Sequence, residues 1–215
     1  MSKPEITLID YGVGNLLSVQ RGLEHCGAKV ILTSDPEAVI AASRVVLPGV
    51  GAFANAMQAL EERNLVLAIR ELAKRGTPLL GICLGMQLLL DGSEEFGLTS
   101  GLGLIPGRVV PIPTTTVAGD AQKIPHIGWN GLVPAEGRMD WRESVLTDNE
   151  PGEATYFVHS FMSVPADPAH RVADCFYGGY RVAAVIAKDQ ITACQFHPEK
   201  SGEVGLKILR QFVGV

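Results

Sequence analysis

The sequence predicts an α/β fold with a mixed, mainly parallel central sheet flanked by helices and an antiparallel β section in the C-terminal half. Over roughly the first 90 residues, short apolar runs alternate with segments of helical periodicity, which is typical of parallel strands covered by helices on both faces. From about Gly101, short β-type runs follow one another with turn residues between them. A length of 215 residues fits one domain, so residues 1–215 are expected to form a single domain.

The N-terminal half is expected to alternate strands with helices. Strands are predicted for the short apolar runs at 5–10, 28–32, 44–47 and 77–82. Helices are predicted where apolar residues recur three or four positions apart, at about 15–26, 35–42 and 52–75, with the last one broken near Asn64. Gly27 is expected to end the first helix, and Asp35-Pro36 to begin the second.

The C-terminal half is expected to be built from short strands. They are predicted within the runs at 103–112, 123–132, 154–164, 173–179, 180–189 and 191–197. The last three are separated by short turns, which is the spacing of an antiparallel meander. Residues 111–122, rich in Pro, Thr and Gly, are predicted to form a mobile surface loop. A helix capped by Ser201, with Glu203 in its first turn, is expected to end at Phe212.

Composition and charge narrow the classes of function. The net charge of −5 gives no reason to expect binding to nucleic acid or to an anionic membrane, which favours a small molecule or another protein as ligand. No apolar run approaches the ~18 residues that span a bilayer, and the N-terminus lacks a signal-peptide profile, so a cytoplasmic location is expected. The four cysteines are widely spaced and form no CxxC pair, so neither a zinc site nor a disulfide framework is expected. No cofactor and no other metal site is expected.

One cysteine stands in a pattern that is typical of a nucleophile. Cys83 is the central residue of GICLG (81–85), between a predicted strand and a predicted helix over 85–90. Flanking glycines permit a sharp turn that lifts a nucleophile clear of the sheet edge. The helix N-terminus favours the thiolate, and the Leu84 N–H points to where an oxyanion would form. The alternative is that Cys83 is a small core residue in a tight turn.

A thiol nucleophile needs a base, and the sequence offers five histidines: His25, His126, His159, His170 and His197. His197 ends a predicted strand, is followed by Pro198, and has Glu199 two residues on. A carboxylate in that position can orient the ring and hold its tautomer. His25 and His170 are expected to be surface residues, and His126 and His159 to be structural ones. Cys83 and His197 are separated by 197 − 83 = 114 residues, so only the fold can bring them together.

A Pro/Gly loop, LPGVGAF (47–53), follows the third predicted strand. In a doubly wound sheet this loop opens at the same carboxyl edge as the Cys83 turn, which is the edge where such sheets bind ligands. Its glycines could present backbone N–H groups to an oxyanion, although a plain strand-to-helix turn explains the spacing equally well. A phosphate-binding loop is excluded because the Gly-Lys-Ser/Thr ending is missing.

These segments, taken together and in this order, resemble the class I glutamine amidotransferases. The shared segments are LPGVGAF (47–53), GICLGMQ (81–87) and QFHPEKS (195–201). A fuller set resembles the glutaminase subunits of imidazole glycerol phosphate synthase in histidine biosynthesis: DYGVGN (10–15), SEEFG (93–97), GLGLIPGRV (101–109), PHIGWN (125–130) and YFVHSF (156–161). The resemblance covers nearly the whole chain and implies the flavodoxin-like sheet of that family.

The resemblance implies roles for particular residues. Cys83 would attack the side-chain amide of glutamine, His197 would move the proton, and Glu199 would orient His197. The resemblance also implies an oxyanion hole made by the Leu84 N–H and the Val50-Gly51 peptide. It further implies that L-glutamine is held by four residues: Gly49, Gln87, Glu95 and Ser160.

The resemblance also implies a partner, a (β/α)8-barrel cyclase with which the chain forms a heterodimer and to which it passes ammonia. Nascent ammonia must reach that subunit without meeting water, because protonation destroys its nucleophilicity. The peptides around Val50 are flanked by Gly49 and Gly51 and can rotate at modest cost. We therefore expect an oxyanion donor that is misaligned at rest and aligned when the partner's site is filled.

Three other functions are weighed against this one. A glutaminase of the anthranilate or aminodeoxychorismate type would use the same chemistry, but PGVGAF and PHIGWN count against it. An α/β-hydrolase with a cysteine nucleophile normally has its acid before the histidine, whereas Glu199 follows His197. A regulatory subunit with a decayed site would lack a catalytic residue, and none is lacking.

Overall fold

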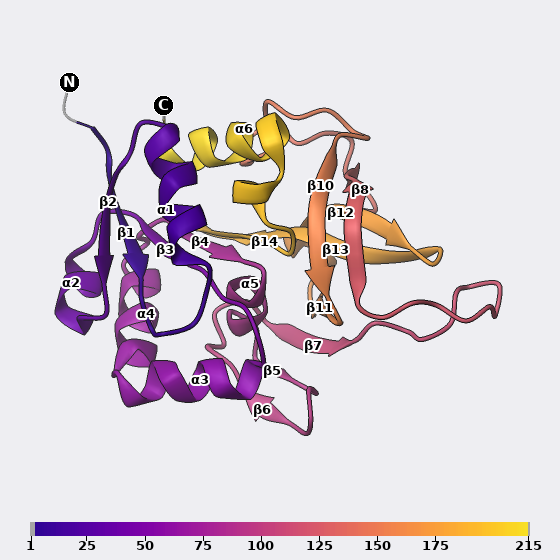
Figure 1. The fold of residues 1–215 in the computed structure, drawn as a ribbon, viewed down its shortest axis with the longest axis horizontal. Helices are drawn as coiled ribbons and strands as arrows, with labels where there is room; N and C mark the ends of the chain where they lie inside the picture. Colours follow the sequence, from indigo (N-terminus) through magenta and orange to yellow (C-terminus); the bar gives the residue numbers. More distant parts are fainter. Residues whose placement is uncertain (1–2, 215) are drawn as a thin grey trace.

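The computed structural model describes residues 3–214 and contains a mixed eight-stranded sheet in the order β2-β1-β3-β4-β14-β13-β12-β9 (Figure 1). The first five strands of that order are mutually parallel, and the last three continue the sheet in antiparallel fashion. This confirms the predicted fold class. The strands are β1 (Glu5–Ile9), β2 (Lys29–Thr33), β3 (Val45–Leu47), β4 (Leu79–Ile82), β9 (Val133–Pro134), β12 (Arg171–Tyr177), β13 (Tyr180–Lys188) and β14 (Ile191–Cys194).

Six α-helices within residues 3–214 cover the two faces of the sheet (Figure 1). They are α1 (Leu16–His25), α2 (Pro36–Ala41), α3 (Phe53–Glu62), α4 (Leu65–Lys74), α5 (Leu84–Leu88) and α6 (Gly202–Val213), with 3-10 turns η1 (Pro168–His170) and η2 (Pro198–Lys200). Ile6 and Leu8 of β1 pack in one core with α1 and α6, whereas Ile9 packs in the other with α3 and α4. The alternation follows from the two-residue period of a strand.

Two smaller sheets stand beside the central one. A four-stranded sheet has the order β11-β7-β5-β6, and β10 pairs with β8 in a two-stranded one. Their bounds are β5 (Gly92–Ser93), β6 (Thr99–Ser100), β7 (Gly107–Pro111), β8 (His126–Gly131), β10 (Ala154–His159) and β11 (Phe161–Pro165). The long loop between β7 and β8 projects from the body (Figure 1) and is closed by a bridge between Thr115 and Ala121. Its predicted mobility stays a prediction.

Local rules explain three element boundaries in the N-terminal half. The Asp35 carboxylate caps α2 by accepting from the Glu37 N–H at 3.0 Å. Asn64 adopts the left-handed conformation, with φ of 56°, and separates α3 from α4 as predicted. Gly27 follows α1 with φ of +90°, a conformation that costs glycine little.

The prediction that the Ser201 side chain caps the last helix is wrong. Ser201 does stand before α6, but its hydroxyl donates to the His197 carbonyl at 2.6 Å and accepts from the Tyr156 N–H at 3.0 Å. Both hydrogen-bonding functions of the oxygen are thereby used in linking β10 to the segment after β14. The hydroxyl contributes to the position of His197 instead of to the helix end.

The predicted meander of β12, β13 and β14 is confirmed, and it ends in a reversal that matters for function. β14 is antiparallel to β13 but parallel to β4, with Cys194 opposite Ile82. The Cys83 N–H donates to the Cys194 carbonyl at 2.8 Å. Segments that follow β4 and β14 therefore lie at the same edge of the sheet, despite their separation in sequence.

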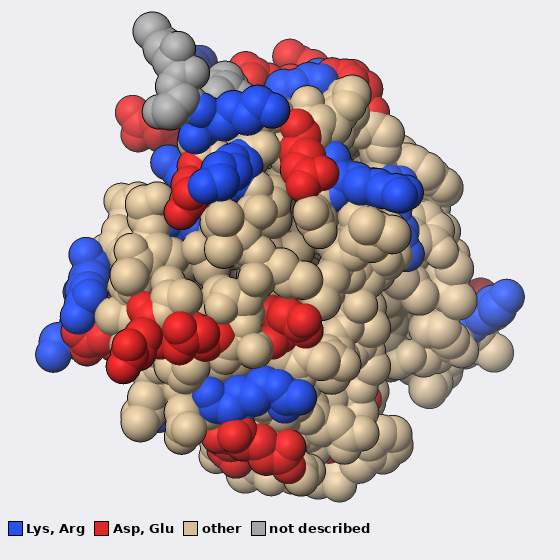
Figure 2. Space-filling model, turned by 60° about the vertical axis from the view of Figure 1, so that its left-hand side comes forward, with Lys and Arg blue, Asp and Glu red and all other residues tan. Residues whose placement is uncertain are grey.

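The face over β1 and β2 carries charges of both signs. Figure 2 shows lysine and arginine side chains interspersed there with aspartate and glutamate, without a field of one sign. The Lys29–Glu5 pair, 2.9 Å apart, is more than half exposed on both sides and so adds little stability. Within residues 3–214, no helix has the length and apolar character needed to cross a membrane.

Replacing Asp174 by asparagine is expected to destabilise the fold by about 2 kcal/mol. The Asp174 carboxylate is 1% exposed and accepts from Arg171 at 2.7 Å and from Arg181 at 3.0 Å, joining β12 to β13. The substitution removes the negative charge that faces two arginine guanidinium groups. Because both guanidinium groups are partly exposed to solvent, the expected loss of stability is smaller than for a fully buried ion pair. Urea unfolding measures the change, and Asp189→Asn is the control, because Asp189 is 79% exposed and has a φ of 54° that asparagine tolerates. Equal losses in the two variants would contradict the expectation.

Candidate active site

Cys83 occupies a strained turn between β4 and α5. Its φ is 55° and its ψ is −112°, a conformation that costs a residue with a side chain on the order of 1–3 kcal/mol. Glycine is required at positions 81 and 85 because a side chain there would clash with neighbouring strands. A Cβ on Gly85 would lie 1.9 Å from the Leu47 oxygen, and one on Gly81 would lie 3.0 Å from the Ala193 Cβ. The glycines thus let the turn pack against β3 and β14 while it presents the thiol at the sheet edge.

His197 and Glu199 form a buried pair just after β14. The Nδ1 atom of His197 lies 2.7 Å from the Glu199 Oε1, and the side chains are 3% and 0% exposed. The backbone N–H of His197 donates to the Tyr156 carbonyl at 3.0 Å, and the Ser201 hydroxyl donates to the backbone carbonyl of His197. Both backbone polar groups of His197 are therefore hydrogen-bonded. A carboxylate at Nδ1 leaves Nε2 as the ring nitrogen available for chemistry.

The surroundings keep His197 protonated at neutral pH. Burial by itself lowers the pKa of His197, but its interactions with Cys83 and Glu199 outweigh burial and raise the pKa to about 9. Nε2 is buried and makes no hydrogen bond of good geometry with any of residues 3–214, although the Cys83 side chain is close enough to act on the ring. His197 therefore carries its positive charge next to the Cys83 side chain.

A carbonyl of the loop between β3 and α3 accepts a hydrogen bond from the backbone N–H that follows Cys83. The Leu84 N–H donates to the Gly49 carbonyl at 3.3 Å. The Leu84 N–H is therefore not free to bind an oxyanion while the Gly49-Val50 peptide keeps this orientation. Gly51 has a φ of +91° with open space around it, and Val50 is 39% exposed, so the loop has room to rearrange.

A cavity of about 500 Å³ opens over Cys83, and most of the predicted site residues line it. These residues are Val50, Gly51, Cys83, Leu84, Gln87, Glu95, Ser160 and His197. Two of the predicted residues lie just outside the lining. The Gly49 carbonyl accepts from the Leu84 N–H, and the Glu199 carboxylate contacts Nδ1 of His197. The cavity is thus bounded by the Cys83 turn, the loop before α3, the β5–β6 connection and the end of β10.

The amide of Gln87 is held by the wall of this cavity. Its Nε2 donates to the Phe161 carbonyl at 3.1 Å and to the Gln195 Oε1 at 3.0 Å. Both N–H groups are thereby used, and Gln87 has its side-chain oxygen left to accept from a ligand. The Glu95 Oε2 accepts from the Phe53 N–H at 2.6 Å, which ties the cavity rim to the first residue of α3.

Comparison with known proteins decides the family. The family model described as glutamine amidotransferase class-I matches residues 7–214. The chain belongs to the class I glutamine amidotransferases. It is 50% identical to the imidazole glycerol phosphate synthase subunit HisH 1 of Legionella pneumophila (strain Lens), over 98% of this chain and 99% of the relative. Identity to the HisH subunit of Geobacter sulfurreducens is 46%, with 97% of each chain covered.

Solved structures agree with the fold of this amidotransferase. A structure described as a glutamine amidotransferase superposes with a TM-score of 0.71 at 14% identity, covering 97% of this chain and 99% of the other. PurLQS from Thermotoga maritima gives a TM-score of 0.72 at 19% identity, covering 98% and 97% of the two chains. At such low identities the likeness speaks for the shared fold.

Sequence reasoning missed one residue that the amidotransferase fold brings next to Cys83. The Gln195 Nε2 lies 3.9 Å from the Cys83 Sγ, and its side chain is fully buried. A pattern in the sequence could have found it. Gln195 stands two residues before His197 in an extended segment, and positions two apart in a strand share one side.

His126 and His159 form a second buried pair beside the cavity. Nδ1 of His159 donates to the Phe161 carbonyl at 2.8 Å, which leaves its Nε2 to accept from Nδ1 of His126 at 2.9 Å. Burial lowers the pKa of both rings to about 4, so both are neutral at pH 7. Their contacts agree with the predicted structural role, since they brace the turn between β10 and β11.

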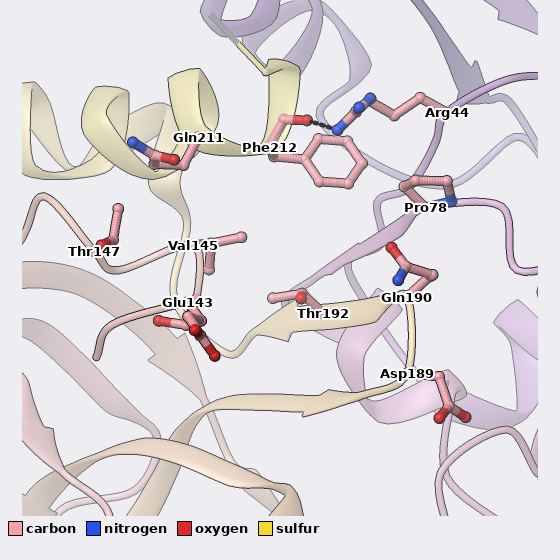
Figure 3. Close-up of a pocket in the computed structure, with 11 residues that line it drawn as sticks. Arg44, Pro78, Glu143, Val145, Thr147, Asp189, Gln190, Thr192, Gln211 and Phe212 are labelled. Carbon is pink, nitrogen blue, oxygen red and sulfur yellow. Dashed lines mark hydrogen bonds between the residues drawn. The ribbon is translucent and has the colours of Figure 1, made fainter. Parts of the chain in front are cut away.

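A second cavity, of about 440 Å³, lies at the opposite edge of the sheet (Figure 3). Its walls come from the segments before β3, β4 and β14 and from the end of α6, including Arg44, Pro78, Gln190 and Phe212. Arg44 donates to the Phe212 carbonyl and lies over the Phe212 ring, 5.3 Å from its centroid (Figure 3). The described residues that line this second cavity include no cysteine, histidine or lysine, and the Cys83 cavity is therefore taken as the candidate active site. Among residues 3–214, no group of His, Cys, Asp and Glu is arranged to hold a metal ion.

Proposed function

We propose that this chain hydrolyses L-glutamine in the cytoplasm and passes the ammonia to a (β/α)8-barrel cyclase, as the glutaminase subunit of a heterodimeric imidazole glycerol phosphate synthase. The cyclase would use the ammonia to form imidazole glycerol phosphate and AICAR in histidine biosynthesis. The observation that carries the proposal is the meeting of Cys83 with the buried His197–Glu199 pair at one sheet edge. The relatives named as HisH subunits support the choice among amidotransferases.

The proposed chemistry uses the three side chains that meet at the site. The Cys83 thiolate attacks the side-chain amide carbon of glutamine, and the carbonyl electrons move to the oxygen. His197 gives its proton to the amide nitrogen, the C–N bond breaks, and ammonia leaves a thioester behind. The neutral His197 ring then takes a proton from water, the water oxygen attacks the thioester carbon, and glutamate leaves as the thiolate re-forms. Glu199 stabilises the cationic ring in both steps.

The loop before α3 is proposed to control this reaction. In the first tetrahedral intermediate the oxyanion needs backbone donors, and the Leu84 N–H is occupied by the Gly49 carbonyl. The peptide concerned is Gly49-Val50, one before the Val50-Gly51 peptide that the resemblance implies. Its rotation would remove that carbonyl and turn the Val50 N–H toward the same place. Gln87, Glu95 and Ser160 line the cavity where the substrate amide and its α-substituents would lie. Occupation of the partner's site would favour the rotated loop.

The pH dependence of glutamate release tests the role of His197. The ring must be protonated to give its proton to the leaving amide nitrogen, so kcat is expected to fall as pH rises through about 9, where His197 loses its proton. Glu199→Gln removes a charge that raises the pKa of His197, so the alkaline limb should move to lower pH by about one unit or more. Glu61→Gln, on the exposed side of α3, should leave the limb in place. An unchanged limb in Glu199→Gln would refute the assigned pair.

The acceptor of the ammonia is tested with glutamine labelled with ¹⁵N in the side-chain amide. The chain, its cyclase subunit and the cyclase's nucleotide substrate are incubated with the labelled glutamine. We expect ¹⁵N in the imidazole ring of the product. The rival function, with an anthranilate-type acceptor, predicts label in an aromatic amine when the corresponding synthase subunit is supplied. Label found only as free ammonia with every acceptor would contradict the proposed partner.

A further inference from the structure

We propose that Gln195 is a further catalytic residue, whose side-chain N–H donates to the Cys83 sulfur and stabilises the thiolate when it attacks and when it leaves. The proposal rests on the proposed role of Cys83 as the nucleophile. It adds a neutral donor to the charged pair formed by His197 and Glu199.

Position and burial place Gln195 beside the sulfur. Its Nε2 lies 3.9 Å from the Cys83 Sγ, within the longer range of hydrogen bonds to sulfur, and the side chain is 0% exposed. The backbone is held close by, since the Cys83 N–H donates to the Cys194 carbonyl at 2.8 Å and the Gln195 N–H donates to the Ala184 carbonyl at 2.9 Å. Gln195 therefore reaches the sulfur from a rigid strand end.

The orientation of the Gln195 amide follows from its neighbours. The Gln87 Nε2 contacts the Phe161 carbonyl, which can only accept, so this end of Gln87 must be the donor. The same Nε2 donates to Gln195 at 3.0 Å, so the Gln195 atom facing it must be the oxygen. The amide nitrogen of Gln195 is left to face Cys83. Gln87 thus donates a hydrogen bond to Gln195, and Gln195 donates one to the sulfur.

The other groups around the sulfur explain why a neutral donor is needed. The Val158 carbonyl lies 4.0 Å from the Cys83 Sγ, and a carbonyl accepts from a thiol but repels a thiolate. His197 is a donor, but it gives its proton away in each turnover. The Gln195 N–H does not titrate, so it faces the sulfur throughout the cycle. A hydrogen bond to an ionised group is worth more than one between neutral groups.

Two isosteric variants of the full-length chain separate donation from packing. Gln195→Met keeps the length of the side chain and removes the donor, whereas Gln195→Glu keeps its shape and sets an acceptor against the sulfur. The readout is the rate at which iodoacetamide alkylates Cys83 at pH 7, followed by peptide mass, with thermal unfolding of each variant. Cys83→Ala gives the background, which should be low, because burial raises the pKa of Cys175 to about 12 and also raises those of Cys26 and Cys194. Gln58→Glu, exposed on α3, is the matched control.

We expect alkylation about tenfold slower in Gln195→Met and about 100-fold slower in Gln195→Glu, at unfolding temperatures close to that of the unmodified chain. Gln58→Glu should label at the original rate. Rates within twofold of the original in Gln195→Met, or a rate in Gln195→Glu no lower than in Gln195→Met, would overturn the proposal. If Gln195→Glu does not fold, the Gln195→Met rate decides. Alkylation needs neither glutamine nor a partner. If the rates follow this order but no glutamine is hydrolysed even in the complex with the cyclase and its nucleotide ligand, the proposed function is refuted, whereas the donation from Gln195 to the Cys83 sulfur stands.

Discussion

Cys83→Ala is expected to lower glutamine-dependent formation of the cyclase product by about 10⁴-fold or more, because the atom that forms the thioester is removed. Turnover by the same complex with ammonium salts as nitrogen source should remain largely intact. The substitution removes only the sulfur atom of a side chain that lines the cavity, so little packing is lost and the heterodimer should still form. Glutamate release and product formation, measured with glutamine and with ammonium chloride, give the two rates.

The matched control is Cys26→Ala, which removes another nearly buried thiol, at the end of α1 and away from the cavity. It should keep glutamine-dependent activity within a few fold of the original. Glutamate release that persists in Cys83→Ala would show that another group is the nucleophile. Loss of both activities in Cys83→Ala would indicate a structural role, contrary to the site described above.

Gly85→Ala is the second substitution with a large expected effect. The added Cβ would lie 1.9 Å from the Leu47 oxygen and 2.9 Å from the Leu47 carbon, both backbone atoms that cannot turn aside. The Cys83 turn and β3 would have to separate, which we expect to cost about 3 kcal/mol of stability. It would also displace Leu84 and the loop after β3, and glutamate release should fall by about 100-fold or more.

Gly27→Ala is the comparison for Gly85→Ala. Gly27 has a φ of +90° but nothing within 4 Å of an added Cβ, so the substitution introduces backbone strain without a clash. We expect a loss of about 1 kcal/mol and unchanged kinetics. Thermal or urea unfolding and glutamine kinetics should be measured for both variants. Gly85→Ala with unchanged stability and activity would show that the contact between the turn and β3 is looser than described.

Local pattern predicted the parts of the fold that local chemistry determines. Asp35-Pro36 began a helix, Asn64 broke one, and the short turns of the meander joined neighbouring antiparallel strands. Ser201 was predicted wrongly because its hydroxyl is used by Tyr156 and His197, which lie far from it in sequence or outside the helix. A capping rule reads only the nearest residues. The separation of the smaller strands into two further sheets was likewise out of reach, because short β runs do not specify their partners.

In the candidate site, too, the features set by local sequence were predicted and those that depend on distant segments were not. GICLG and the His-Pro-Glu segment identified the nucleophile, the base and its orienting carboxylate as candidates, because those roles require particular residue types at fixed local spacing. The meeting of Cys83 with His197 depended on β14 lying parallel to β4, which composition and periodicity do not give. Two contacts could be found only from the three-dimensional structure. These are the Gly49 carbonyl at the Leu84 N–H and the Gln195 amide at the Cys83 sulfur.

The central claim is that Cys83, His197 and Glu199 hydrolyse glutamine only slowly while the Gly49 carbonyl occupies the Leu84 N–H. The most direct test is glutamate release from saturating glutamine by the chain alone, with the cyclase subunit, and with the cyclase subunit plus its nucleotide ligand. We predict slow release by the chain alone and an increase of about 100-fold or more in the liganded complex, the usual worth of one oxyanion donor. Equal kcat values in the isolated chain and the liganded complex would contradict the account, because the oxyanion site would then be formed without the partner.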